Sequence, residues 1–145
     1  MEERSPAQVY ALVIGGTLAV AGIIGFFYNA SFATGDGTER DAVLGILDVN
    51  GWHNVVHVVT GVLGLAVAGS YGGARAYALG LGVAYLLVAG IGFAAGDGDE
   101  IFNLLPVNTE DNVFHLLLGV AGLGAGLATP ATIAPSTVPA HAARR

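Results

Sequence analysis

The chain has 145 residues, of which 54% are hydrophobic and 11% are charged, and its formal net charge at pH 7 is −6. Soluble domains carry roughly twice this fraction of charged residues, so the composition predicts an integral membrane protein in contact with the lipid bilayer. The few basic residues form no patch, which excludes a nucleic-acid partner. The absence of cysteine excludes disulfides, thiolate metal sites and cysteine nucleophiles.

Four apolar stretches are long enough, or nearly so, to cross a hydrocarbon core of about 30 Å at about 1.5 Å per helical residue. Pro6 suits the first turn of the first helix, and Pro130 ends the fourth. The second and fourth stretches are short, but Asn50 and Asn108 are good N-caps from which both helices can begin. The predicted membrane spans are Val9–Tyr28, Val55–Ser70, Ala76–Ala95 and Val113–Thr129.

Most of the chain reads as two copies of a helix, a loop and a second helix. Tyr10–Phe27 aligns with Tyr77–Ala94, and Asn54–Leu65 (NVVHVVTGVLGL) aligns with Asn112–Leu123 (NVFHLLLGVAGL). The shift between copies is about 67 residues in the first helix and about 58 in the second, so the first loop is longer by roughly nine. Ala33–Asp41 is the predicted insertion.

These features predict an all-α fold, a four-helix transmembrane bundle that forms a single membrane domain over residues 1–145. In the two outer loops, residues 43–49 and 101–107 are apolar, and we expect them to form short helices or re-entrant plugs that cover the end of the bundle. The predicted organisation is two tandem helix-loop-helix repeats followed by a disordered cytoplasmic tail: about 6–70, about 76–129, and 130–145.

The arginines predict the orientation of the bundle in the cell membrane. Arg4, Arg75, Arg144 and Arg145 flank one side of the predicted helices, and only Arg40 falls on the other. Because arginine and lysine are enriched in cytoplasmic segments, both termini are expected in the cytoplasm. The two long loops then face outward, and their many aspartates and glutamates make that face acidic.

A polar stripe runs down one face of the second helix and is repeated on the fourth. Asn54 and His57 are followed at steps of three and four by glycines, and Asn112 and His115 are followed in the same way. Small residues let membrane helices approach closely, and polar residues hydrogen-bond across the contact. The stripe is therefore predicted to be a structural cluster, in which Asn54, His57, Asn112 and His115 satisfy one another or the loop backbone.

The alternative hypothesis is a metal site on the same helices. His53 lies one turn before His57, and Asp111 lies one turn before His115, so three imidazoles and a carboxylate fall near one depth. The set His53, His57, Asp111 and His115 would suit zinc, copper or iron. A second form of this alternative is haem b held between His57 and His115, with glycines making room for the ring.

The chain is not expected to be an enzyme. The serines and threonines of the outer loops have no histidine and acid arranged around them, so the sequence offers no catalytic nucleophile. The sequence thus predicts a small multi-pass membrane protein with a non-enzymatic structural, accessory or partner-binding role and no cofactor. The alternative is a metal- or haem-binding membrane protein. The glycine-rich helices make a homo-oligomer or another membrane protein the expected partner.

Two segments carry a resemblance to a known family. Val49–Ala66 (VNGWHNVVHVVTGVLGLA) and Leu104–Leu127 (LLPVNTEDNVFHLLLGVAGLGAGL) resemble the prokaryotic membrane family described as domain of unknown function 4383. The resemblance spans essentially all of residues 6–129. It implies a small multi-pass protein with a pair of Asn-x-x-His helices, and it brings no established activity.

Overall fold

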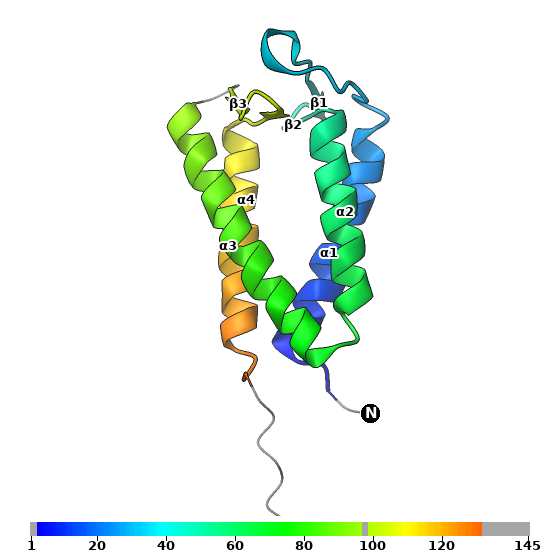
Figure 1. Cartoon of the computed structure of the whole chain (residues 1–145), viewed down its shortest axis with the longest axis vertical. Helices are drawn as coiled ribbons and strands as arrows, with labels where there is room; N and C mark the ends of the chain where they lie inside the picture. The colour runs from blue at the N-terminus through cyan, green and yellow to red at the C-terminus, as the bar shows by residue number, and fades with distance from the viewer. Residues whose placement is uncertain (1–2, 97–98, 132–145) are drawn as a thin grey trace, which may run out of the picture.

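The computed structural model describes residues 3–96 and 99–131. In this part of the chain, four α-helices run along the long axis of the molecule and short strands gather at one end (Figure 1). The predicted disordered tail, 130–145, lies outside the described residues from position 132 onward. The helices are α1 (Pro6–Gly25), α2 (Gly51–Val67), α3 (Tyr71–Ala95) and α4 (Thr109–Leu127).

By length and composition, α1 and α3 could each cross a membrane, and α2 is a shorter apolar helix of 17 residues. Pro6 lies in the first turn of α1, as predicted, whereas α3 begins at Tyr71, before the predicted start at Ala76. Asn50 caps α2 by accepting the backbone N–H of His53 at 2.9 Å, and Asn108 caps α4 by accepting that of Asp111 at 2.8 Å. Both caps satisfy donors that a first helical turn leaves unpaired, so they fix the ends of the two helices that carry the histidines.

Close backbone contact defines two helix pairs, α1 with α2 and α3 with α4. A Cβ atom added to Gly15 would lie 2.9 Å from the carbonyl oxygen of Gly61, and one added to Gly82 would lie 2.8 Å from the backbone nitrogen of Leu123. Both distances are too short for a real Cβ. The helices in each pair can approach this closely because glycine has no side chain.

Two tyrosines join the helix pairs in the half of the molecule that lies away from the strands. The Tyr10 hydroxyl on α1 donates to the carbonyl of Leu118 on α4 at 2.9 Å. The Tyr77 hydroxyl on α3 donates to the carbonyl of Thr60 on α2 at 3.0 Å. Because each bond reaches a helix of the other pair, the two bonds hold the pairs together. The buried alanines around them are Ala7, Ala11, Ala68, Ala74 and Ala78.

The connections at the other end form two antiparallel hairpins, so the prediction of short helices over 43–49 and 101–107 is wrong. Leu44 and Gly45 in the first turn, and Phe102 and Asn103 in the second, have positive φ. Glycine and asparagine adopt this left-handed conformation readily and favour tight hairpin turns. The strands are β1 (Asp41–Val43) with β2 (Leu47–Val49), and β3 (Glu100–Ile101) with β4 (Leu105–Pro106).

Each hairpin accepts a hydrogen bond from the N-cap asparagine of a helix in the other helix pair. The Asn50 side-chain amide donates to the carbonyl of Leu104 at 2.8 Å, and the Asn108 amide donates to the carbonyl of Ile46 at 2.7 Å. The predicted insertion contains the 3₁₀ turn η1 (Gly35–Gly37). The Gly35 N–H donates to Asn103 in the second hairpin at 3.0 Å. The hairpins therefore form a fixed cap over the ends of α2 and α4.

The glycine contact predicts opposite effects for two Gly→Ala substitutions. At Gly61 a methyl group would collide with the backbone of α1 at Ala19, whereas at Gly124 on α4 nothing lies within 4 Å of an added Cβ. Gly61→Ala should lower stability by about 1–3 kcal/mol through overpacking. Gly124→Ala should leave stability unchanged or raise it, because alanine favours helix. Thermal unfolding in detergent, followed by circular dichroism, measures both, and equal midpoints would contradict this packing.

Candidate metal centre

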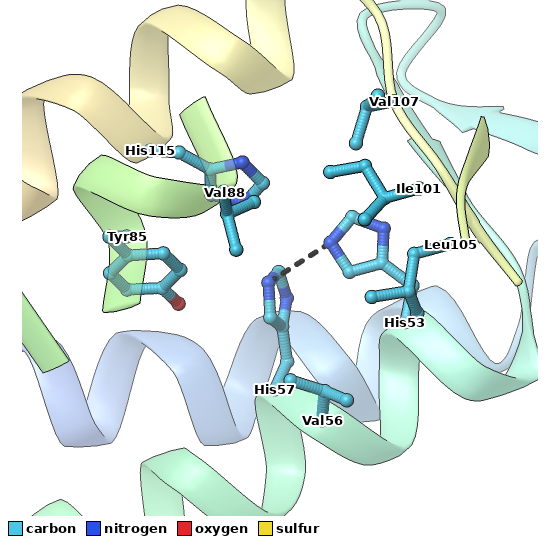
Figure 2. A pocket seen from close by; sticks show the side chains of 9 residues that line it. All are labelled: His53, Val56, His57, Tyr85, Val88, Ile101, Leu105, Val107 and His115. Carbon is cyan, nitrogen blue, oxygen red and sulfur yellow. Dashed lines mark hydrogen bonds between the residues drawn. The ribbon is translucent and has the colours of Figure 1, made fainter. Parts of the chain in front are cut away.

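Three of the four predicted ligand residues meet beneath the hairpin cap. His53 and His57 lie one turn apart on α2, and His115 faces them from α4 (Figure 2). One ring nitrogen from each of the three lies within 4.8 Å of the other two. The shortest separation, 3.1 Å, joins Nε2 of His53 to Nε2 of His57. The i, i+4 spacing on α2 places these two imidazoles on the same helix face.

The three imidazoles line a small cavity of about 40 Å³. Apart from Tyr85, apolar side chains form the rest of its wall, and Ile101 and Leu105 of the second hairpin cover it together with Val107, which follows that hairpin. The apolar loop segments therefore cover the end of the bundle, as expected, although as hairpins. A cavity of this volume can hold a single ion or water molecule.

Burial leaves polar atoms of this cluster without partners. His53 and His115 are only 4% and 5% exposed. Their Nδ1 atoms, and the hydroxyl of Tyr85, make no hydrogen bond within the described residues. An unsatisfied buried polar group costs about 1–3 kcal/mol. These unpaired polar atoms therefore make the cluster costly to bury.

Asp111, the fourth predicted ligand, lies outside the group of three. It occupies the first turn of α4, before the predicted span begins at Val113, and its carboxylate accepts the N–H groups of Asp48 at 2.9 Å and Asn108 at 3.3 Å. Burial raises the pKa of Asp111 to about 7, although these two N–H groups favour the carboxylate form. Asp111 thus fixes β2 to α4 and, with His53 and His57, lines a neighbouring cavity of about 160 Å³.

Asn54 and Asn112, the asparagines of the predicted polar stripe, face away from the histidines. The Asn54 amide donates to the carbonyl of Asn29 at 2.8 Å, which is the predicted contact with the loop backbone. The carboxamide oxygens of Asn54 and Asn112 lie against Gly25 and Gly92, on the partner helices of their own pairs. The predicted polar stripe is therefore divided, with its asparagines packed inside the helix pairs and its histidines between them.

Three imidazoles with no carboxylate among them suit a first-row transition metal ion. Zinc binds imidazole nitrogens at about 2.0–2.1 Å, so two ligands of a tetrahedral ion lie about 3.3 Å apart. The separation between His53 and His57 is close to this value, and the His115 nitrogen, which lies within 4.8 Å of theirs, must move closer. Calcium and magnesium prefer oxygen ligands and do not match this set. The cavity is too small for a porphyrin, so haem b does not fit.

Sequence reasoning missed Tyr85, which completes the wall of this cavity. Its ring stacks on the His115 ring with centroids 5.0 Å apart and planes 15° apart. The only sequence signal was a tyrosine within an apolar span, at a position that aligns with Leu18 in the first half of the chain.

Comparisons with known proteins place the chain in a family and assign no activity. A search of curated proteins and a search of solved structures found no match. The family model for a domain of unknown function (DUF4383) matches residues 8–128, which is most of the chain. The chain therefore belongs to the DUF4383 family.

Proposed function

We propose that the chain is a non-enzymatic, multi-pass membrane protein that binds one first-row transition metal ion at His53, His57 and His115. The observation that carries this proposal is the convergence of three imidazole nitrogens within 4.8 Å of one another beside a small cavity. Imidazole is a common ligand of zinc and copper, and three such ligands leave one tetrahedral position for a fourth group.

The distribution of side-chain size supports the membrane part of the proposal. The buried positions of α1 and α3 are mostly alanine and glycine. Large aliphatic residues point outward on every helix, as shown by Val20, Val59, Leu87 and Leu117, each more than half exposed. A soluble bundle buries such residues, whereas membrane helices pack through small residues and present large ones to lipid.

Four crossings with both termini in the cytoplasm agree with the distribution of charge. Arg4 and Arg75 lie near the ends of helices away from the hairpins, while the hairpin end is acidic. The matching contacts of Gly15 and Gly82, and of Asn54 and Asn112, support an origin in two tandem repeats.

A bound ion would act as a link between the helix pairs. His53 and His57 belong to α2, which packs mainly on α1, and His115 belongs to α4, which packs mainly on α3. Coordination would therefore tie the two pairs together beneath the cap. We infer an accessory role in which metal loading sets the rigidity of this end of the protein and of the surface that it presents to partners.

A second candidate is a purely structural cluster, and the 3.1 Å contact between the His53 and His57 rings favours it. One ring would donate a hydrogen bond to the other, and His115 would complete the packing. Metal content separates this candidate from the metal centre.

Single cysteines in this cysteine-free chain test the topology. Gly37→Cys lies on η1, where an added Cβ meets nothing within 4 Å, and Glu3→Cys precedes α1. In intact cells a membrane-impermeant maleimide should label Gly37→Cys at once and Glu3→Cys only after permeabilisation. Immediate labelling of Glu3→Cys alone would show that the bundle has the opposite orientation. Immediate labelling of both variants would argue against a bundle embedded in the membrane.

Metal content tests the site directly. Protein purified in detergent without a histidine tag should bind one equivalent of Zn²⁺ or Co²⁺, measured by elemental analysis and by the cobalt absorption spectrum. His57→Gln and His115→Gln should lose the ion, because each removes one of three ligands. His141→Gln, which changes the fourth histidine of the chain, is the matched control and should bind normally. Metal-free wild type, or unchanged binding by His57→Gln, would refute the proposed centre.

Bound metal should also raise stability. An ion that binds only the folded protein stabilises it by about 2.7 kcal/mol at a free concentration 100 times the Kd. Thermal unfolding of wild type should therefore shift upward with added Zn²⁺, and His115→Gln should show no shift. An equal shift in both proteins would place the effect outside this cluster.

A further inference from the structure

Tyr85 brings a third helix to the histidine cluster. It lies on α3, is 6% exposed, and its ring stacks on His115. In Figure 2 its oxygen lies on the side of the ring that faces His57. The same small cavity is lined by Tyr85 and by all three histidines. Tyr85 therefore shares the wall of the cavity that the imidazoles line.

The hydroxyl of Tyr85 differs from those of the two other buried tyrosines. Tyr10 and Tyr77 each donate to a backbone carbonyl of another helix. The Tyr85 hydroxyl makes no hydrogen bond within the described residues. Buried tyrosine hydroxyls usually find a partner, because leaving one unsatisfied is costly. Phenylalanine would fill the same space without this cost, so the oxygen itself requires an explanation.

We propose that Tyr85 is the fourth ligand of the metal ion and binds it through its phenolate oxygen. This inference rests on the proposed metal centre. Three imidazoles occupy three positions of a tetrahedral ion, and the Tyr85 oxygen is the remaining polar group among the described residues that line the cavity. Stacking on His115 fixes the tyrosine ring and limits the directions in which its oxygen can point.

The charge of a phenolate explains how a divalent ion can be held in an apolar pocket. On binding, the O–H bond of Tyr85 breaks, an O–metal bond forms, and the proton leaves for solvent. Three neutral imidazoles and one phenolate reduce the net charge of the site from +2 to +1, which lowers the cost of burying the ion. An anionic oxygen with three nitrogens favours Cu²⁺ and Zn²⁺ over softer, univalent copper.

Two residues of this site occur in only one half of the chain. When the halves are aligned, Tyr85 lies opposite Leu18, and His53 lies opposite Asp111. Both Tyr85 and His53 line the same cavity. The paired residues His57 and His115 therefore contribute to a single four-ligand centre, with the two additional ligands supplied from α2 and α3.

Cu²⁺ is the probe that distinguishes tyrosine ligation, because a copper-bound phenolate absorbs visible light by charge transfer. Wild type loaded with one equivalent of Cu²⁺ should show this band, and resonance Raman excitation within it should show tyrosinate vibrations. Tyr85→Phe should still bind one equivalent, with at least tenfold weaker affinity and without the band. Tyr77→Phe, which removes a buried hydroxyl from the same helix, is the matched control and should keep the band.

Proton release gives a second readout that does not depend on colour. In weakly buffered detergent solution at about pH 6, where a water on three-histidine zinc keeps its proton because its pKa is about 7, wild type should release one more proton per bound Zn²⁺ than Tyr85→Phe does. Circular dichroism confirms that the variant is folded. An unchanged spectrum and equal proton release in Tyr85→Phe would overturn tyrosine ligation while leaving the histidine centre in place. Wild type that binds neither metal would overturn the histidine centre, and tyrosine ligation with it.

Discussion

Close contact between helix backbones is the constraint on which the rest of this molecule depends. Gly15 against Gly61, and Gly82 against Leu123, leave no room for side chains between the helices of a pair. Large aliphatic residues consequently lie on the outside of the bundle. Because the helices of the pair are so close, the Asn54 side chain lies against Gly25 in the interior of the pair.

The space between the helix pairs follows from this arrangement. Tyr10 and Tyr77 join the pairs in one half of the molecule through bonds to backbone carbonyls. At the other end Asn50 and Asn108 connect the pairs, because the side-chain amide of each donates a hydrogen bond to the hairpin of the other pair. The histidines lie between the pairs beneath that cap, so the environment of His53 and His57 is set in part by the second hairpin, which follows α3 in the chain.

Burial gives the histidine cluster its chemical character. Three imidazoles lie among aliphatic side chains, and imidazole binds metal ions in its neutral form. A cavity of about 40 Å³ has room for an ion but not for a porphyrin. In the proposed centre Tyr85 adds an oxygen to three nitrogens, and a donor set of this kind discriminates among cations through ligand type and geometry.

The helices, their caps at Asn50 and Asn108 and their glycine stripes could be predicted from the sequence, because period, capping chemistry and composition are local properties. The hairpins could not be recognised from apolar content alone, since Gly45 and Asn103 decide the turns through their left-handed backbone. The candidate site was determined in part by the sequence, because the spacing of His53 and His57 already places them on one helix face. Only the tertiary structure decided that His115 and Tyr85 join them while Asp111 turns to Asp48, because those contacts depend on how separate helices and hairpins pack.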